Sequence, residues 1–366
     1  MHALIMIPPS GDSVVERWVA TGRREAAHHL VHILQACKST IPIHILTAEK
    51  ADRNVFEDGS VASIKISKSP FHFGEALCAF VRDEQPETML YFGAGSAPLV
   101  SFELIEQALS IVGTSKNPKA YVNNFHSTDW AIFNHAQEII GMHERLPQDN
   151  QLGWVMKNKA GYEIAAAPFT LETSVNIDTP MDLLMIAMHP SKGQRFKDMI
   201  PDYALAALQR VEAFVEVMQK PGNTIAIIGR SSSHIWAMLE QKTKLWLRVF
   251  VEERGMVASG RLERGEVRSL VGELVMHIGH ASFVRHLASI CDAVLWDTRV
   301  WMGHQGIWPS QVDRFAADLG LTEEIQDQSL RSLTRAVVQA DIPIITGGHG
   351  VVAGNILALL KKLEEG

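Results

Sequence analysis

The sequence predicts an α/β protein of two domains, with a parallel Rossmann-like sheet in the second. Short apolar runs alternate with longer helical patterns along the chain, which is typical of layered α/β folds. The chain has 366 residues, more than one compact core of ordinary size holds, so two domains are expected. Four apolar runs in the second half are each followed by polar or glycine-rich residues, and this favours a parallel sheet with helices on both faces.

The expected elements follow from these runs and from helix start and stop signals. Buried strands are expected at 3–7, 43–47, 88–92, 120–124, 224–228, 247–251, 293–296 and 342–345. Helices are expected at 25–37, 74–82, 102–112, 179–188, 202–219, 233–241, 267–276, 281–289, 308–319, 327–339 and 351–363. The clearest start is Thr179-Pro180, an N-cap and an N1 proline with Asp182 in the first turn. The predicted domains are 1–195 and 223–366, joined by a helical linker at 196–222.

The composition limits the classes of function. A hydrophobic fraction of 46% and a charged fraction of 20% are typical of globular proteins in water. The net charge of −7 argues against nucleic-acid partners, although it allows a single bound nucleotide. We expect a cytoplasmic protein with no membrane partner, because the sequence has no signal peptide and no stretch of 18 apolar residues. A homodimer is left open as its assembly.

Cysteine and histidine spacing gives no sign of a disulfide framework or of a zinc motif. The three cysteines are scattered, and we expect them to be buried and reduced. The 16 histidines include the adjacent pair His28-His29, which does not have the spacing of zinc ligands, and no HExxH motif occurs. The sequence therefore predicts no structural zinc.

Three stretches of the first half carry a family resemblance. These are Ala3–Thr47, then Phe73–Leu109 with the run GAGSAPLVSFELIEQAL, and Asn176–Leu183, which reads NIDTPMDL. Together they resemble the MobA/CofC/IspD-like nucleotidyltransferases, which have a GT-A-like fold, over residues of about 1–190. The last stretch is the most specific, and it lies where that family closes its domain. The resemblance implies a GT-A-like nucleotidyltransferase domain at the N-terminus.

The resemblance also implies a nucleotide site with Mg²⁺. In such a site backbone N–H groups after the first strand cradle a triphosphate, and carboxylates hold the metal. The implied nucleotide-binding residues are Ser10, Gly11, Gly74, Ser96, Asn123 and Asn124. This sequence departs from the family twice. Ser96 stands where the family has its metal-binding Asp, and Pro8-Pro9 removes two N–H donors from the loop.

Other polar residues near strand ends are candidates for replacing the missing acid. We expect Asp178 and Asn176 as metal ligands, and Asp178 and Asp129 as catalytic residues. Each candidate also has a simpler interpretation. Asn123-Asn124 makes a turn, Asp129 caps a following helix, Asp149-Asn150 lies in an ordinary loop, and Asp178 bonds nearby backbone.

A second candidate pocket is predicted where the four strands of the second domain end. The carboxyl ends of parallel strands meet at one edge, where ligands bind. The candidate residues are Arg230, Ser231, Glu253, Arg254, Asp297, Arg299, Gly348 and His349. Cations and a glycine loop at a helix start suit a phosphate or carboxylate ligand. The simpler interpretation is a solvated charge cluster or a structural ion pair at Glu252-Glu253-Arg254.

Three hypotheses follow, of which the first is the one that we adopt from the sequence. The first is an enzyme that binds a nucleotide or nucleotide-activated small molecule and transfers a nucleotidyl group with Mg²⁺. The second is a non-catalytic ligand-binding or regulatory protein whose C-terminal pocket binds a small anionic metabolite. The third places a transferase or lyase reaction in that pocket, using Glu253, Asp297 and His349.

Overall fold

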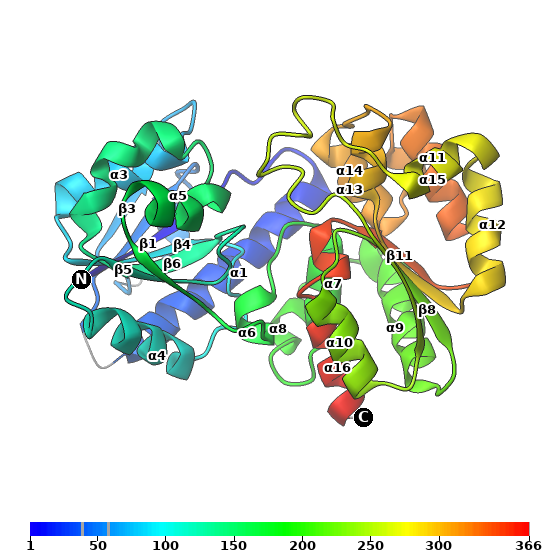
Figure 1. Ribbon diagram of the computed structural model, residues 1–366, viewed down its shortest axis with the longest axis horizontal. Helices are drawn as coiled ribbons and strands as arrows, with labels where there is room; N and C mark the ends of the chain where they lie inside the picture. Colours follow the sequence, from blue (N-terminus) through cyan, green and yellow to red (C-terminus); the bar gives the residue numbers. More distant parts are fainter. Residues whose placement is uncertain (38–39, 57–58, 366) are drawn as a thin grey trace. The chain divides into compact units, whose positions relative to one another are not determined.

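The computed structural model describes residues 1–37, 40–56 and 59–365. The chain forms two compact units, each with its own sheet (Figure 1). The first unit consists of Met1–Ser10 and Arg23–Ser174, and the second of Gly11–Gly22 and Val175–Gly366. The two units are defined by compact packing, which does not show whether each of them folds independently. The domain boundaries at 195 and 222 therefore stay a prediction.

The first unit contains a mixed seven-stranded sheet in the order β3-β2-β1-β4-β6-β5-β7. Its strands are β1 (His2–Ile7), β2 (Ile43–Thr47), β3 (Ser63–Ile66), β4 (Thr88–Gly93), β5 (Lys119–Val122), β6 (Trp130–Asn134) and β7 (Glu163–Ala166). Strand β6 runs antiparallel to β4 and β5, and the other neighbours are parallel. The direction of strand order reverses at β1 and β4, so the carboxyl ends of these two strands form the switch point where ligands commonly bind.

Helices cover both faces of this sheet. Alternate residues of β1 point to opposite faces, so Ala3 and Ile5 pack with α1 and α4, whereas Leu4 and Met6 pack with α3, η1 and α5. The helical elements are α1 (Val14–Ala36), α2 (Asp52–Val55), α3 (Phe73–Glu84), α4 (Phe102–Gly113), η1 (Ala136–Arg145), η2 (Asp149–Gln151), α5 (Leu152–Lys159) and α6 (Leu171–Ser174).

The second unit contains a parallel four-stranded sheet in the order β11-β10-β8-β9. Its strands are β8 (Thr224–Gly229), β9 (Trp246–Val251), β10 (Ala293–Asp297) and β11 (Ile344–Gly347). The α/β class and the second parallel sheet are therefore confirmed. The switch point of this sheet lies between β8 and β10, because β8 has its sequence neighbour β9 on the other side.

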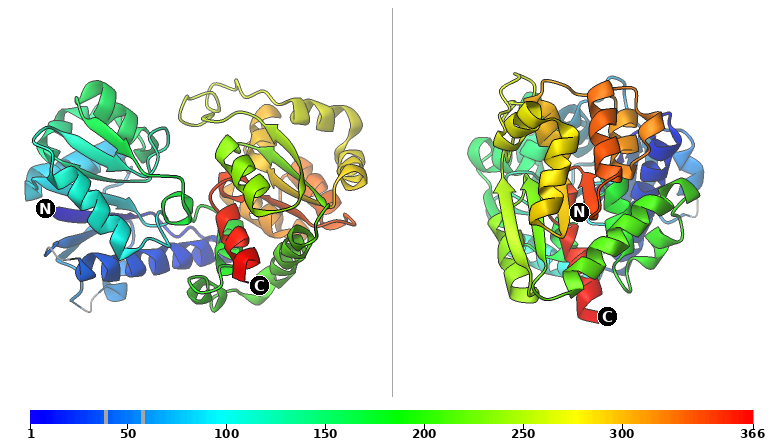
Figure 2. Two further views of the ribbon diagram at one scale, coloured as in Figure 1. Left: turned by 60° about the horizontal axis from the view of Figure 1, so that its bottom comes forward. Right: turned by 90° about the vertical axis from the view of Figure 1, so that its right-hand side faces the viewer.

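Helices also flank the second sheet on both faces, as the two views of Figure 2 show. Helices α11 to α15 pack their apolar side chains on one face, and α7 and α9 contact the strands from the other. The helical elements are α7 (Pro180–Ala187), α8 (Gln194–Lys197), η3 (Asp202–Ala204), α9 (Leu205–Gln219), α10 (Ser233–Lys242), α11 (Leu270–Ile278), α12 (His280–Ile290), α13 (Thr298–His304), α14 (Gln311–Leu319), η4 (Thr322–Glu324), α15 (Gln328–Val338), η5 (His349–Val352) and α16 (Ile356–Glu365).

Most expected elements are present, with several informative differences. The strands β3, β6 and β7 were not expected from the sequence, nor were helices such as α5 and α13. Helix α1 begins at Val14, eleven residues before the expected start at residue 25. The helix start at Thr179 is confirmed, because Thr179 and Asp182 form a capping box with Pro180 at N1.

The compact units divide the chain differently from the expected domains. The resemblance implied that Asn176–Leu183 closes the N-terminal domain, whereas compact packing groups this segment with the second unit, and the domain bounds stay a prediction. The physical reason is that all eight residues of α7 are buried there, where α7 packs against α8, α14 and α16. The expected linker helix likewise packs on the second sheet as α9.

Two further features concern cysteines and membranes. Cys37, Cys78 and Cys291 are all buried and free, as expected. Among the described residues, no helix combines the length and the apolar character that crossing a lipid bilayer would require.

Candidate functional site

The resemblance implies that the loop after β1 binds phosphate. In the structure, a carboxylate accepts a hydrogen bond from the backbone of this loop. The backbone N–H of Ser10 donates to Glu49 Oε1 at 2.5 Å. Glu49 in turn accepts from Arg24 at 3.0 Å, and Arg24 also pairs with the buried Asp52. The N–H that would face a phosphate is thus occupied by an anion, and the nearest cation is neutralised by two acids.

The next residues of the same loop are arranged in a similar way. The N–H groups of Asp12 and Ser13 both donate to Glu16 Oε2, and Ser13 Oγ accepts from the Glu16 N–H. This is a capping box at the start of α1. Gly11 has a φ of +78°, and a Cβ there would lie 2.7 Å from the Glu16 carboxyl carbon. Gly11 therefore leaves room for the Glu16 side chain. Glu16 already accepts the hydrogen bonds of the N–H groups of Asp12 and Ser13 before α1.

Ser96 is placed at the carboxyl end of β4 but is held in a turn. Its hydroxyl donates to the Gly93 carbonyl at 2.6 Å, and its backbone N–H bonds the same oxygen at 3.0 Å. Ala97, which follows, has a φ of +53°. The Ser96 side chain, which is largely buried, thus closes the turn after β4, and its nucleotide-binding role stays a prediction.

The Asn123 and Asp129 side chains bond each other across the turn between β5 and β6. Asn123 Nδ2 donates to Asp129 Oδ2 at 2.9 Å, and Asn123 Oδ1 accepts from the Asp129 N–H at 2.9 Å. Asn124 Oδ1 accepts from the His126 N–H, which is a local turn bond. The turn interpretation thus describes both asparagines. The helix-cap interpretation of Asp129 is wrong, because strand β6 begins at Trp130.

A second carboxylate, that of Asp149, lies beside the same strand end. Tyr91, which is fully buried in β4, donates its hydroxyl to Asp149 Oδ2 at 2.9 Å. Burial and then the charge of Asp149 raise the pKa of Tyr91 well above its usual value, and Asp129 adds to this. A Cβ atom added at Gly93 would lie 3.5 Å from the Asp129 carbonyl oxygen and 3.8 Å from Asp149 Oδ2. Asp129 and Asp149 therefore flank the switch point of the first sheet.

The expected metal ligands Asp178 and Asn176 lie in the second unit and bond each other. Asn176 Nδ2 donates to both carboxylate oxygens of Asp178 at 3.2 and 3.3 Å, while Asn176 Oδ1 accepts from the Ile177 N–H. The amide thus presents nitrogen to Asp178 and uses its oxygen elsewhere. Because Mg²⁺ takes oxygen ligands, this pair as arranged does not fit a magnesium site.

Gly74, an implied nucleotide-binding residue, has a packing role in the structure. It is the second residue of α3, and its N–H donates to the Leu146 carbonyl at 2.8 Å. A Cβ at this position would lie 2.4 Å from the His143 carbonyl oxygen. The glycine lets α3 approach the backbone of η1 closely.

We expect Gly74→Ala to destabilise the protein by about 1 to 3 kcal/mol, because the added methyl collides with backbone that cannot rotate away. Urea unfolding measures this loss. Gly113→Ala is the matched control, since Gly113 also lies in a helix, at the end of α4, and no atom lies within 4 Å of its Cβ position. Equal stabilities of the two variants would contradict the packing role.

The four strand ends of the second unit bring most of the predicted pocket residues together. Arg230, after β8, makes two hydrogen bonds with Asp297, the last residue of β10, at 2.6 and 3.2 Å. Burial alone would raise the pKa of Asp297, but the Arg230 guanidinium outweighs it and holds the pKa below its usual value. Gly229 has a φ of +121°, and a Cβ there would lie 2.5 Å from Asp297 Cβ. The glycine lets the two strand ends meet.

Two more cationic or titratable groups lie within electrostatic reach of this pair. The charges of Arg230, Arg254 and Asp297 all act on the imidazole of His349, which follows β11. Arg254 follows β9 and is exposed. Within the described residues its guanidinium has no hydrogen bond or ion pair. Ser231, which is 1% exposed, has a hydroxyl with no partner among those residues. We call Arg230, Ser231, Arg254, Asp297 and His349 the strand-end site.

Arg299 does not present its charge to a ligand. Both of its Nη atoms bond the carboxylate of Asp318, at 2.7 and 2.6 Å. Both side chains are buried, with 6% and 0% exposed. Arg299 therefore ties α13 to α14 through Asp318, and its membership of the pocket stays a prediction.

Glu253 and Gly348 are also held by structure around them. Glu253 Oε2 accepts two bonds from Arg261, and its Oε1 accepts from the Arg268 N–H. This is the structural ion pair that the sequence left open. Gly348 lies where a Cβ would approach Thr179 Cγ2 to 3.0 Å, so the glycine loop is shaped by packing on the start of α7.

Sequence reasoning missed several residues that matter at these places. Glu49 and Asp149 flank the first sheet's ligand edge, and Asp182 and Asn355 join the glycine loop to α7. Asp149 was noted only as a loop residue. A signal for Asp182 existed in the capping box, but its partner lies 173 residues away, and nothing in the local sequence points to it.

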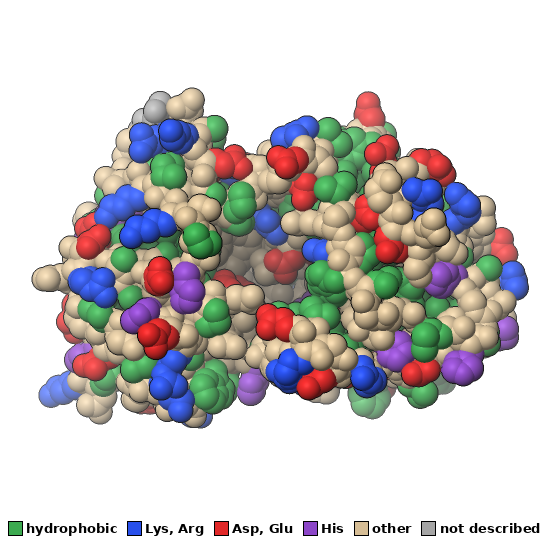
Figure 3. Space-filling model, turned by 90° about the horizontal axis from the view of Figure 1, so that it is seen from above, with side chains coloured by type: hydrophobic (Ala, Val, Ile, Leu, Met, Phe, Trp, Pro, Cys, Tyr) green, Lys and Arg blue, Asp and Glu red, His purple; other side chains and the backbone are tan. Residues whose placement is uncertain are grey.

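The surface is mixed in charge on the face that Figure 3 presents. Lysine and arginine side chains are interspersed there with aspartate and glutamate. This distribution is that of an ordinary solvated surface.

The comparisons find partial likeness in fold. No protein-family model and no curated protein matches this sequence. A cytidylyltransferase from Leptospira borgpetersenii matches with 14% identity and a TM-score of 0.38, covering 58% of this chain and 94% of that chain. A nucleotidyl transferase from Methanothermobacter thermautotroptrophicus matches with 14% identity and a TM-score of 0.38, covering 54% and 98%.

A third solved structure is similar to the same extent. The 4-diphosphocytidyl-2C-methyl-D-erythritolsynthase from Anaerococcus prevotii matches with 15% identity and a TM-score of 0.35, covering 54% of this chain and 95% of that chain. At these identities and TM-scores the likeness concerns the fold of about half of the chain and carries no argument about activity.

Proposed function

We propose that this protein binds a phosphate-bearing small molecule, a nucleotide or a phosphorylated metabolite, at the strand-end site of its second unit. The observation that carries the proposal is the exposed Arg254 guanidinium, unpaired within the described residues, at the ligand edge of a parallel sheet that also holds Arg230 and His349. Arginine is well suited to phosphate, because its planar donors bind two oxygens at once.

The start of helix α10 supports this assignment. The chain runs from Gly229 through three serines into α10, and the N-cap residue Ser232 makes no side-chain cap bond. A helix start carries a partial positive charge, which favours an anion. The buried Ser231 hydroxyl, which has no partner among the described residues, is a further donor at this point. Burying a hydroxyl without a hydrogen bond costs about 1 to 3 kcal/mol, which a bound ligand offsets.

The first unit is a weaker candidate for the same ligand. The Ser10 N–H of its phosphate loop is occupied by the carboxylate of Glu49, and Ser96 is held by Gly93. An incoming triphosphate would have to displace this anion from an N–H group that it needs. This supports the second of the three hypotheses, that of a ligand-binding protein.

The third hypothesis, catalysis in the second unit, has less support. Asp297 is paired with Arg230, and Glu253 with Arg261. Carboxylates held in this way are poor general bases, because the neighbouring guanidinium stabilises the charged form.

We expect Arg254→Ala to abolish most of the rise in melting temperature that a nucleoside triphosphate or pyrophosphate produces in the wild type. The variant removes a surface cation and leaves the Arg230–Asp297 pair intact. Thermal unfolding with increasing ligand measures the shift, which grows with ligand concentration over Kd. Arg285→Ala is the control, because Arg285 is another exposed arginine of the same unit. Equal ligand-induced shifts in both variants would contradict the proposal.

A second candidate function, nucleotidyl transfer with Mg²⁺ in the first unit, is favoured by one observation. Asp129 and Asp149 flank Gly93 at the switch point, and their carboxylates are of the type that holds Mg²⁺ beside a nucleotide's phosphates. When bound, the ion would neutralise phosphate charge. Pyrophosphate release from a nucleoside triphosphate by the wild type, lost in Asp149→Asn, would establish this activity. No release by the wild type would exclude it.

A further inference from the structure

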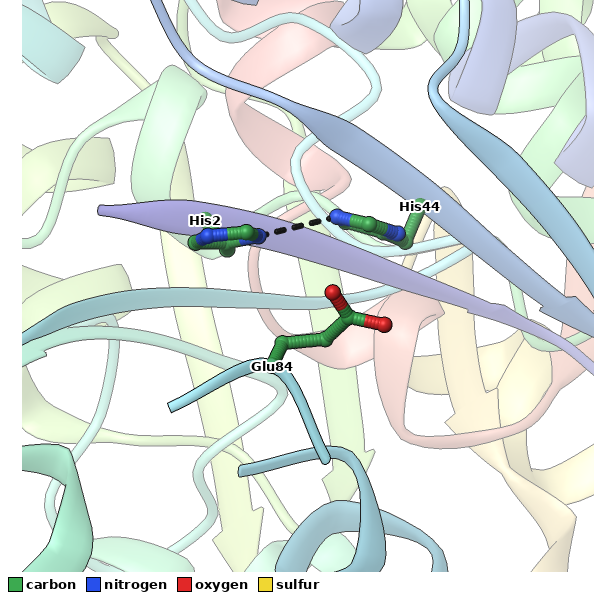
Figure 4. A group of neighbouring side chains, drawn as sticks. All are labelled: His2, His44 and Glu84. Carbon is green, nitrogen blue, oxygen red and sulfur yellow. Dashed lines mark hydrogen bonds between the residues drawn. The ribbon is translucent and has the colours of Figure 1, made fainter. Parts of the chain in front are cut away.

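Two histidines and a glutamate meet in the first unit at the end of the sheet opposite its ligand edge. His2 is the first residue of β1, His44 the second residue of β2, and Glu84 the last residue of α3. Leu4 pairs with His44 across the two strands. His2 lies two residues before Leu4 and shares its face of the sheet. Both imidazoles therefore lie on the face covered by α3, where Glu84 points toward them (Figure 4).

The geometry of the three side chains suits one metal ion. One ligand atom from each residue lies within 4.8 Å of the other two. His2 Nδ1 and His44 Nε2 face each other at 3.0 Å. Two imidazole nitrogens on a tetrahedral zinc, each at about 2.05 Å from the ion, are roughly 3.3 Å apart. Converting the hydrogen-bonded pair into a ligand pair therefore takes a widening of a few tenths of an ångström and a turn of the rings that directs both lone pairs at the ion.

The surroundings fix the direction in which the rings face. His44 Nδ1 lies 2.7 Å from Ser63 Oγ on β3, so Nε2 is the nitrogen left for the cluster. A hydrogen bond of this kind orients metal-binding histidines in general. Phe80 packs edge-on against His44, with ring centroids 5.0 Å apart. The two nitrogens that face each other need one proton between them, and a divalent ion replaces that proton.

The charges are those of a site for a divalent ion. The cluster offers two imidazoles and one carboxylate, and imidazole binds a metal ion in its neutral form. Lys65 Nζ lies 3.0 Å from Glu84 Oε1. The lysine thus occupies one carboxylate oxygen and competes with a cation for Glu84.

A pocket adjoins His44, one member of the cluster. His44 lines it together with Lys65 and Phe80, and its volume is about 200 Å³. An ion held by three protein ligands keeps a fourth position for water, as in zinc sites with a His₂Glu ligand set.

We propose that His2, His44 and Glu84 bind one Zn²⁺ ion, with water from the adjacent pocket in the fourth position. Imidazole nitrogens select zinc and its neighbours in the first transition row over Mg²⁺. This site is independent of the proposed phosphate ligand, because it lies at the amino-terminal ends of β1 and β2 in the first unit. It was not expected from the sequence, where the two histidines are 42 residues apart.

Zinc binding to the metal-stripped full chain, with any purification tag at the C-terminus so that His2 stays in its native setting, tests the proposal. Calorimetry with ZnCl₂ is expected to give one ion per chain, and Co²⁺ is expected to give the strong visible absorption of four-coordinate cobalt. His44→Gln and Glu84→Gln are each expected to weaken zinc binding by at least about tenfold. His126→Gln is the control, because His126 is an exposed imidazole of the same unit.

The variant Lys65→Met distinguishes zinc binding at this site from nonspecific zinc binding by other histidines. Removing the ammonium frees Glu84 Oε1, so this variant is expected to bind zinc more tightly than the wild type. Weak binding at several ions per chain, or affinity that is the same in His44→Gln, Glu84→Gln and His126→Gln, would overturn the proposal. The pair would then be a hydrogen-bonded packing contact on Phe80. Glu84 is partly exposed, so loss of binding in Glu84→Gln with unchanged melting temperature is not a folding defect.

Discussion

Arg299→Met is expected to lower the free energy of unfolding by about 3 to 5 kcal/mol, because it leaves the fully buried Asp318 carboxylate without its partner. Removing one member of a buried pair costs more than the pair contributes, since the remaining charge has neither water nor a counter-ion. Chemical unfolding followed by circular dichroism measures the loss.

Two variants separate this mechanism from a general effect of losing an arginine. The double variant Arg299→Met with Asp318→Leu is expected to recover most of the stability, because no buried charge is left. Arg264→Met removes one partner of the exposed Arg264–Glu266 pair and is expected to leave the unfolding curve unchanged. If Arg299→Met unfolds at the same denaturant concentration as Arg264→Met, the buried pair does not have the role assigned here.

Asp182→Ala is expected to lower the free energy of unfolding by roughly 3 to 4 kcal/mol. Asp182 is completely buried, and its Oδ2 accepts from the Thr179 and Asp178 N–H groups, while its Oδ1 accepts from Asn355 Nδ2 at 2.6 Å. The alanine variant loses the cap of α7 and leaves these donors buried without an acceptor. Differential scanning calorimetry is a suitable measurement.

The conservative variant Asp182→Asn gives the pH control. Burial and then the Asp178 carboxylate raise the pKa of Asp182 from the usual range of aspartate to about 7. The folded state therefore holds a proton that the unfolded state has released at this pH. The stability of the wild type is expected to fall relative to Asp182→Asn as the pH rises from about 5 to about 8. A difference that is flat or rises with pH would show that the carboxylate is charged throughout.

The second sheet was predictable because its strands are continuous apolar runs followed by turn residues. Thr224–Gly229 and Ala293–Asp297 are buried along almost their whole length, as central strands of a parallel sheet are. Strand β6 was missed because Trp130–Phe133 is a run of only four apolar residues, and periodicity alone does not separate a buried strand from a helix at this length. Strands β3 and β7 have few buried residues and give little signal.

The site residues were predictable only as far as topology determines them. Arg230, Arg254, Asp297 and His349 come together because each follows a strand of one parallel sheet. What each side chain then bonds depends on partners distant in the sequence. The Asp318 carboxylate that engages Arg299 lies on another helix, and no local pattern indicates it.

Bonding partners that are distant in the sequence also explain which site residues of the first unit could not be predicted. The family-like positions Ser10 and Ser96 were identified correctly as belonging to strand ends, but the Glu49 carboxylate on the Ser10 N–H comes from the loop after β2. The histidine cluster was invisible for a similar reason, since a search for zinc spacing considers neighbours in sequence, whereas His2 and His44 are neighbours across two strands.

The most direct test of the central claim is a crystal structure of the protein soaked with a nucleoside triphosphate or with pyrophosphate. The account predicts density for phosphoryl groups at the strand-end site, in contact with Arg254 and with the start of α10. Phosphoryl density beside Asp129 and Asp149 instead, with the strand-end site holding only water, would contradict it and would assign ligand binding to the first unit.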